Sequence, residues 1–176
     1  MEDVEIIEKN VDEDLEIISI FRDFHEAKVG GAFIGLASYE LSNNFYLSLI
    51  KRGVAVIITF TRPKVDVPYV LIKRNPGVFN IIIRNYYDNP GSKMKLIGVT
   101  GTNGKTSSTM LLKHILEQVC NTKVGLIGTI ENLIGDVSFP TERTTPVGHK
   151  LQKLLAKMYE AGCEYVVMEV TSHSLV

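Results

Sequence analysis

The sequence predicts an α/β fold with two parts, a small N-terminal α/β domain and then the first part of a second domain with a mostly parallel sheet. Three observations lead to this prediction. Apolar, β-branched runs alternate with segments of helical spacing along the chain. A turn-forming stretch, Asp-Asn-Pro-Gly-Ser at residues 88–92, interrupts this alternation. Directly after it, residues 94–119 read as a strand, a glycine-rich turn and a helix.

The composition is that of an ordinary globular protein. Of the 176 residues 45% are hydrophobic and 22% are charged, and the net charge of −1 gives no reason to expect nucleic acid or an anionic membrane as a partner. No apolar run approaches the roughly 20 residues that span a bilayer, and the acidic N-terminus is unlike a signal peptide. Cys120 and Cys163 lack metal-site spacing. We therefore expect a reduced, cytoplasmic protein, and the sequence leaves its oligomeric state open.

We expect the first domain to cover residues 1–91. The acidic stretch formed by the first sixteen residues is compatible with a strand, a helix or a frayed end. In the helix near residue 50, Asn43 or Asn44 is the expected cap, and Gly53 is the expected end. The expected elements are strands at residues 15–21, 32–35, 54–59 and 69–73 and helices at residues 43–52 and 78–87.

A glycine-rich turn at residues 100–106, Thr-Gly-Thr-Asn-Gly-Lys-Thr, opens the second domain, which we expect at residues 92–176. Such a turn directs backbone N–H groups inward, and the following helix adds its positive N-terminus, so the stretch is suited to a polyphosphate. Lys105 can reach the outer phosphates, and the Thr106 hydroxyl is placed to bind Mg²⁺. The general phosphate-loop pattern requires glycine where Val99 stands, so the match is to a narrower variant containing Gly101.

The helix after this turn is predicted to be amphipathic, and further elements follow it. Its apolar stripe is expected to be Leu111, Ile115 and Val119, with Lys113 and Gln118 away from the stripe. The remaining prediction is a strand at residues 123–130, a loop or hairpin at residues 131–141, a helix from Val147 that Gly162 ends, and a buried strand at residues 165–170.

Glu169 is the second feature that points to chemistry. A carboxylate in an apolar strand is costly to bury unless a cation or several donors meet it. Ligands of open α/β sheets gather beyond the carboxyl ends of the strands, so this position favours a Mg²⁺ site. The alternative is a salt-bridged glutamate at a strand end. For Thr144 and Thr145, helix capping is the simpler interpretation from spacing alone, and His173 is expected to have no ligand role.

Four motifs resemble those of the Mur ligases. They are TGTNGKT at residues 100–106, GT at residues 128–129, TTP at residues 144–146 and MEVTSHSL at residues 168–175. Their order and spacing are most similar to those of the members that add the third residue of the peptidoglycan stem peptide. The resemblance is strong from Met94 onward and weaker before it.

The resemblance implies an ATP-dependent ligase that forms an amide bond through an acyl phosphate, with UDP-MurNAc-L-Ala-D-Glu and an amino acid as substrates. It implies that Lys105 and Glu169 are catalytic, and that Thr106 and Glu169 bind Mg²⁺. Thr144, Thr145 and Thr171 would contact the UDP-sugar-peptide. ATP would be held by Gly101, Thr102, Asn103, Gly104, Lys105, Thr106 and Ser107.

The sequence also departs from the family pattern. Asp23-Phe24-His25 stands where the family has Asp-Ser-Arg, and phenylalanine cannot replace a hydroxyl donor to UDP. Arg143 stands where asparagine is typical. The family continues well beyond the Glu169 strand, so the resemblance implies a partial chain that has no ligase activity alone. It does not decide whether lysine or diaminopimelate is the amino acid that is added. The alternative is a degenerate, non-catalytic nucleotide-binding or interaction module.

Overall fold

The structure is a computed structural model, and it describes residues 4–35, 41–75, 77–141, 144–146 and 148–171. The chain divides into two compact units, with the division after Tyr86. Each unit contains one five-stranded sheet and its own helices. The α/β class predicted from the sequence is therefore confirmed. No helix in the described ranges is long and apolar enough to cross a membrane.

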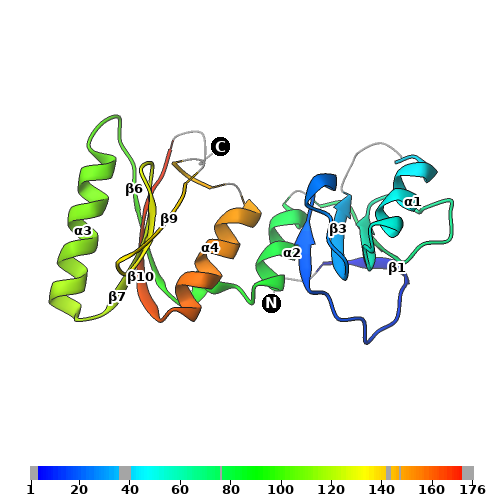
Figure 1. Cartoon of the computed structure of the whole chain (residues 1–176), viewed down its shortest axis with the longest axis horizontal. Helices are drawn as coiled ribbons and strands as arrows, with labels where there is room; N and C mark the ends of the chain where they lie inside the picture. The colour runs from blue at the N-terminus through cyan, green and yellow to red at the C-terminus, as the bar shows by residue number, and fades with distance from the viewer. Residues whose placement is uncertain (1–3, 36–40, 76, 142–143, 147, 172–176) are drawn as a thin grey trace. The chain divides into compact units, whose positions relative to one another are not determined.

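The first unit has a sheet in the order β1-β5-β4-β3-β2. β1 is antiparallel to β5, and the other pairs are parallel. Helices α1 and α2 lie on opposite faces of this sheet (Figure 1). The elements are β1 (Ile6–Asn10), β2 (Ser19–Phe21), η1 (Phe24–Glu26), β3 (Gly31–Gly35), α1 (Asn43–Lys51), β4 (Val56–Thr59), β5 (Tyr69–Ile72) and α2 (Val78–Tyr86).

Two details of this unit differ from the prediction. The cap of α1 is Ser42, whose Oγ accepts a hydrogen bond from the Phe45 N–H at 3.2 Å, so neither Asn43 nor Asn44 is the cap. The strand expected at residues 15–21 is limited to Ser19–Phe21, because only these residues pair with β3. Gly53 follows α1 with φ +82°, a left-handed conformation that favours glycine, so the predicted end of this helix is confirmed.

The second unit has a sheet in the order β6-β10-β7-β8-β9. β6, β10 and β7 are mutually parallel, while β8 and β9 form an antiparallel hairpin, one of the two forms expected for residues 131–141. The elements are η2 (Pro90–Ser92), β6 (Lys95–Val99), α3 (Lys105–Cys120), β7 (Lys123–Ile127), β8 (Asn132–Ile134), β9 (Val137–Phe139), α4 (Gly148–Glu160) and β10 (Cys163–Glu169).

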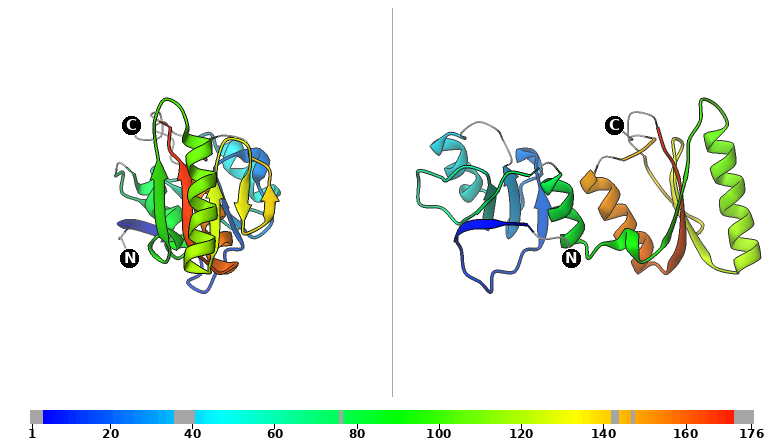
Figure 2. Two further views of the ribbon diagram at one scale, coloured as in Figure 1. Left: turned by 90° about the vertical axis from the view of Figure 1, so that its left-hand side faces the viewer. Right: turned by 180° about the vertical axis from the view of Figure 1, so that it is seen from behind.

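Helices α3 and α4 cover opposite faces of this sheet (Figures 1 and 2). Leu155 and Met158 of α4 pack with Ile127 and Val166, and α3 packs on the face that carries Val124, Leu126 and Val167. The central strands β7 and β10 are therefore apolar on both faces, as expected for parallel strands buried in an α/β unit.

The face of α3 that meets the sheet is not the predicted one. Lys113 is 7% exposed and Thr109 is fully buried, and the Lys113 Nζ pairs with Glu117 Oε1 at 2.6 Å. The predicted apolar stripe is exposed instead, with Leu111 at 61%, Ile115 at 45% and Val119 at 78%. The aliphatic stem of Lys113 can line an apolar face while its ammonium group pairs with Glu117 of the same helix. A lysine can therefore occupy a position on the face of α3 that meets the sheet.

Candidate active site

The candidate site lies where β6 and β10 end. Val99 is the last residue of β6, and it is paired in register with Glu169, the last residue of β10. The Val170 N–H donates to the Val99 carbonyl at 2.9 Å, so the pairing continues to the ends of both strands. Neighbouring strands lie about 4.8 Å apart. The glycine loop (residues 100–104) and the Glu169 carboxylate therefore start from the same level on the same edge of the sheet.

The glycine loop leads directly into α3, a helix of 16 residues. Gly104 is the N-cap residue, with φ +78°, which is a left-handed conformation that strongly favours glycine. Gly104 has no side chain that could bond the N–H groups of the first turn, so these groups face the loop together with the positive end of the helix. This arrangement is suited to binding an anion such as a polyphosphate.

Lys105 lies over the glycine loop. Its Nζ donates to the carbonyl of Gly101 at 2.7 Å and to the carbonyl of Thr102 at 3.4 Å. The ammonium group is thus held by the carbonyls of the glycine loop. Among the other predicted loop residues, Asn103 and Ser107 are exposed, and the half-buried Thr106 lies in the first turn of α3.

Glu169 is only 1% exposed, and within the described residues Thr129 alone bonds its carboxylate. The Thr129 N–H donates to Oε1 at 3.0 Å, and the Thr129 hydroxyl donates to Oε2 at 2.9 Å. Gly128 leaves the space for this contact, because a Cβ there would lie 2.9 Å from Oε1. In the described part of the chain no cationic side chain pairs with Glu169, so the salt-bridge alternative finds no support there.

The threonines predicted to bind substrate are connected to Glu169 or to its partner Thr129 by hydrogen bonds. The Thr144 hydroxyl is hydrogen-bonded to the Thr129 hydroxyl at 3.1 Å. The Thr145 hydroxyl donates to the Glu169 carbonyl at 2.9 Å and accepts from the Thr171 N–H at 3.2 Å. Because α4 begins at Gly148, Thr144 and Thr145 are not its capping residues. The single proton of Thr145 is already donated within the chain, so towards a further ligand this hydroxyl can only accept.

The structure therefore connects the predicted residues in two groups. Lys105 bonds the glycine loop. Thr144 is linked to Glu169 through Thr129, Thr145 bonds the Glu169 carbonyl, and Thr171 bonds Thr145. The register of β6 and β10 connects the two groups. Arg143 and His173 lie outside the described residues.

Thr129 was not predicted as a site residue. It lies in the GT motif, which only the resemblance singled out, and it is 40 residues away from Glu169 in the sequence. No local pattern relates residues so far apart.

Oxygen ligands of the kind that Mg²⁺ prefers are present at this edge of the sheet. Carboxylate and hydroxyl oxygens are the ligands Mg²⁺ prefers, and this ion usually binds through one or two protein groups while phosphates and water complete its shell. Glu169 and Thr106 are such groups. The described residues contain no cluster of three or more His, Cys, Asp or Glu side chains.

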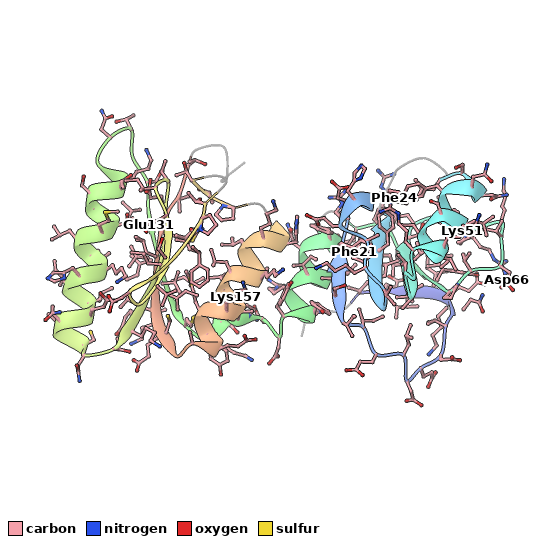
Figure 3. The ribbon with its side chains drawn as sticks, viewed as in Figure 1. Phe21, Phe24, Lys51, Asp66, Glu131 and Lys157 are labelled. Atoms are coloured by element: carbon pink, nitrogen blue, oxygen red, sulfur yellow. The ribbon has the colours of Figure 1, made fainter. Side chains whose placement is uncertain are left out.

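In the first unit, the residues at the family's Asp-Ser-Arg position form a small aromatic cluster. The Asp23 carboxylate accepts from the His25 N–H at 2.8 Å. The Phe24 ring lies 5.6 Å from the ring of Phe45, and the Arg52 guanidinium lies 4.0 Å above the Phe24 ring. Figure 3 shows Phe24 between the sheet and α1. This position therefore contributes to packing and carries no hydroxyl.

Comparisons with known proteins agree with the motifs. Residues 99–176 match the Mur ligase middle domain. The chain is 44% identical over 166 residues to the UDP-N-acetylmuramoyl-L-alanyl-D-glutamate–2,6-diaminopimelate ligase of Caldanaerobacter subterraneus subsp. tengcongensis, with 92% of this chain and 34% of the relative covered. The ligase of the same name from Clostridium tetani is 39% identical over 176 residues, with 97% and 36% covered. The chain thus spans about a third of the length of these relatives.

Solved structures share the fold. A UDP-N-acetylmuramoyl-L-alanyl-D-glutamate–2,6-diaminopimelate ligase matches with a TM-score of 0.68 at 23% identity, covering 94% of this chain and 35% of that one. The MurF ligase of Thermotoga maritima, determined in complex with ADP, matches with a TM-score of 0.54 at 19% identity, covering 91% of this chain and 33% of that one. Motifs, sequence relatives and fold agree that the chain is similar to the Mur ligases, whose middle domain matches residues 99–176.

Proposed function

We propose that this chain provides the first third of an ATP-dependent ligase of peptidoglycan precursor synthesis, which adds the third stem-peptide residue to UDP-MurNAc-L-Ala-D-Glu through an acyl phosphate. The observation that carries the proposal is the registered pairing of Val99 with Glu169. This pairing brings a phosphate-type loop and a buried carboxylate to one sheet edge, in a chain 44% identical to a ligase of this name.

The proposed chemistry requires mainly positioning and charge neutralisation. In phosphoryl transfer the protein aligns the phosphates and the attacking group and stabilises the developing charge. The N–H groups of the glycine loop and of the first turn of α3 would bind ATP, together with Thr102, Asn103 and Ser107. Lys105 would move from the loop carbonyls to the outer phosphates. When bound, Mg²⁺ would neutralise phosphate charge, with Thr106 and Glu169 as its protein ligands.

We assign the substrate to the remaining threonines and the first domain. Thr144 and Thr171 would contact the UDP-sugar-peptide, and Thr145 would hold its segment against the Glu169 carbonyl while accepting from the substrate. Residues 1–91 would form the UDP-substrate domain and residues 92–176 the first part of the ATP-binding domain. Because the named relatives are diaminopimelate ligases, we propose diaminopimelate as the amino acid of the whole protein. Because the reaction consumes ATP, we place it in the cytoplasm.

Titration of ATP with Mg²⁺ into the chain and into Lys105→Ala tests this proposal. We expect the wild-type chain to bind ATP and the variant to bind it at least about tenfold more weakly, because Lys105 lies at the loop that would hold the phosphates. Equal affinity for both proteins, measured by calorimetry, would contradict the assignment of the loop. Unchanged thermal unfolding of the variant without ATP is the control for folding.

A non-catalytic nucleotide-binding module is the second candidate, and Phe24 is the observation that favours it. This ring packs against Phe45 and under Arg52 at a position where the family has a hydroxyl donor. Titration of UDP distinguishes the candidates. Binding of UDP to the wild-type chain, strengthened in Phe24→Ser, supports the ligase, whereas no binding by either protein supports the alternative.

A further inference from the structure

Thr129 binds both oxygens of the buried Glu169 carboxylate although it belongs to a different segment of the sheet edge. Thr129 follows β7, and Glu169 ends β10. The Thr129 N–H reaches Oε1 at 3.0 Å, and its hydroxyl reaches Oε2 at 2.9 Å. We propose that Thr129 is a positioning residue, which holds the Glu169 carboxylate in the orientation that binds the Mg²⁺ of a Mg–ATP complex. This inference rests on the proposed function of the site.

The hydrogen bonds of Thr129 leave part of the carboxylate available to a metal. An ionised carboxylate has about four acceptor positions. Thr129 occupies one on each oxygen, and within the described residues no other side chain bonds the carboxylate. A glutamate side chain is otherwise free to rotate about several bonds, so two hydrogen bonds from one residue fix the direction of its remaining lone pairs.

The same hydroxyl also orients Thr144. A hydroxyl has one proton, and Thr129 donates this proton to Glu169 Oε2 at 2.9 Å. Towards Thr129, 3.1 Å away, the Thr144 hydroxyl must therefore act as the donor. The remaining lone pairs of Thr144 can then only accept, so the substrate group that meets Thr144 is an N–H or O–H donor. Thr129 thus connects the metal carboxylate to the substrate side of the site.

Residues that orient a metal ligand affect metal affinity without touching the metal. Their substitution typically weakens metal binding by about 10–100-fold. A purely structural threonine, needed only to satisfy a buried carboxylate, would instead change the stability of the chain and leave the Mg²⁺ dependence of ATP binding unaffected.

The test uses the full chain and measures ATP affinity by calorimetry with Mg²⁺ and with EDTA. Thr129→Val keeps the shape and the N–H of the residue but removes the hydroxyl, and Thr129→Ser keeps the hydroxyl. We expect Thr129→Val to reduce the gain in affinity that Mg²⁺ provides by about tenfold, Thr129→Ser to retain this gain, and affinities in EDTA to agree for all proteins. Thr59→Val, which removes another buried hydroxyl in the first unit, is the matched control and should leave the gain unchanged.

A double-mutant cycle with Glu169→Gln shows whether Thr129 acts through Glu169. When Glu169→Gln is already present, we expect Thr129→Val to cause no further loss of the Mg²⁺ gain. An equal loss with and without Glu169→Gln, or an unchanged gain in the single variant Thr129→Val, overturns the role of Thr129. If Lys105→Ala weakens ATP binding but Thr129→Val leaves the gain from Mg²⁺ unchanged, this inference alone is overturned. If the wild-type chain binds no ATP, the proposed function is overturned as well.

Discussion

Gly128 and Glu169 are in contact across two strands, and this contact leaves no room for a larger residue at position 128. A Cβ on Gly128 would lie 2.9 Å from Glu169 Oε1. We expect Gly128→Ala to displace the carboxylate, to weaken Mg²⁺-dependent ATP binding by about tenfold and to lower the free energy of unfolding by roughly 1–3 kcal/mol. Calorimetry and denaturant unfolding measure the two effects. Unaltered binding and stability would show that the contact relaxes without consequence.

The two cysteines differ in exposure, and their reactivity should differ accordingly. Cys163 is 4% exposed, and burial raises the pKa of its thiol, so little thiolate forms near neutral pH. Cys120 is exposed. In a titration with Ellman's reagent near neutral pH, we expect one fast thiol in the native chain and a second only after denaturation. Cys120→Ser should remove the fast phase, and a fast phase that persists in this variant would contradict the burial of Cys163.

Single residues also show how far the sequence alone could predict the site. The glycine loop and Lys105 were predictable because their chemistry is contained in one short run, residues 100–106. Glu169 was predictable because a carboxylate in an apolar strand stands out locally. Thr129 and the hydrogen bonds of Thr145 were not predictable, because they depend on how β7, β10 and the segment before α4 converge in three dimensions.

Among the elements, α3 provides a test of which helix face packs on the sheet. The structure and the apolar pattern of the sequence predict that substitutions on opposite faces destabilise the chain. Glu117 neutralises the nearly buried Lys113 at 2.6 Å, so Glu117→Gln should lower the free energy of unfolding by roughly 1–3 kcal/mol, less than the about 3–5 kcal/mol typical of a fully buried pair. Leu111→Gln, on the exposed side of the same helix, should change it by less than about 0.5 kcal/mol.

Urea denaturation of these two variants distinguishes the two faces of α3. A larger loss of stability in Leu111→Gln than in Glu117→Gln would mean that α3 packs on the sheet through the stripe predicted from spacing. The pattern failed here because Leu111, Ile115 and Val119 form one apolar stripe while Thr109, Lys113 and Leu116 form another that is also compatible with packing. Only the contact with the sheet determines which stripe is used.

At the scale of the whole molecule, each unit has a core of its own. Phe33, Leu49 and Ile57 belong to the core of the first, and Ile127 and Val166 to that of the second. We expect residues 1–86 and 87–176, expressed separately, each to unfold cooperatively. Far-UV circular dichroism during heating is the measurement. A non-cooperative transition in either segment would show that its core depends on the other unit.

The two-part organisation was also largely predictable from the sequence. The alternation of strands and helices and the turn at residues 88–92 indicated two α/β groups, and the structure separates its units after Tyr86. The order of the strands was not predictable, because the insertion of β10 between β6 and β7 joins segments that are distant in the sequence.

The insertion of β10 has a consequence for the accuracy of the site. Because β6 and β10 are joined by a ladder of main-chain hydrogen bonds, the level of Glu169 relative to the glycine loop can change only in steps of a residue, about 3.3 Å along the strand. A step of one residue would also turn the Glu169 side chain to the other face. The position of Glu169 relative to the glycine loop therefore changes in whole-residue steps or not at all, and it does not drift gradually with small thermal motions of the fold.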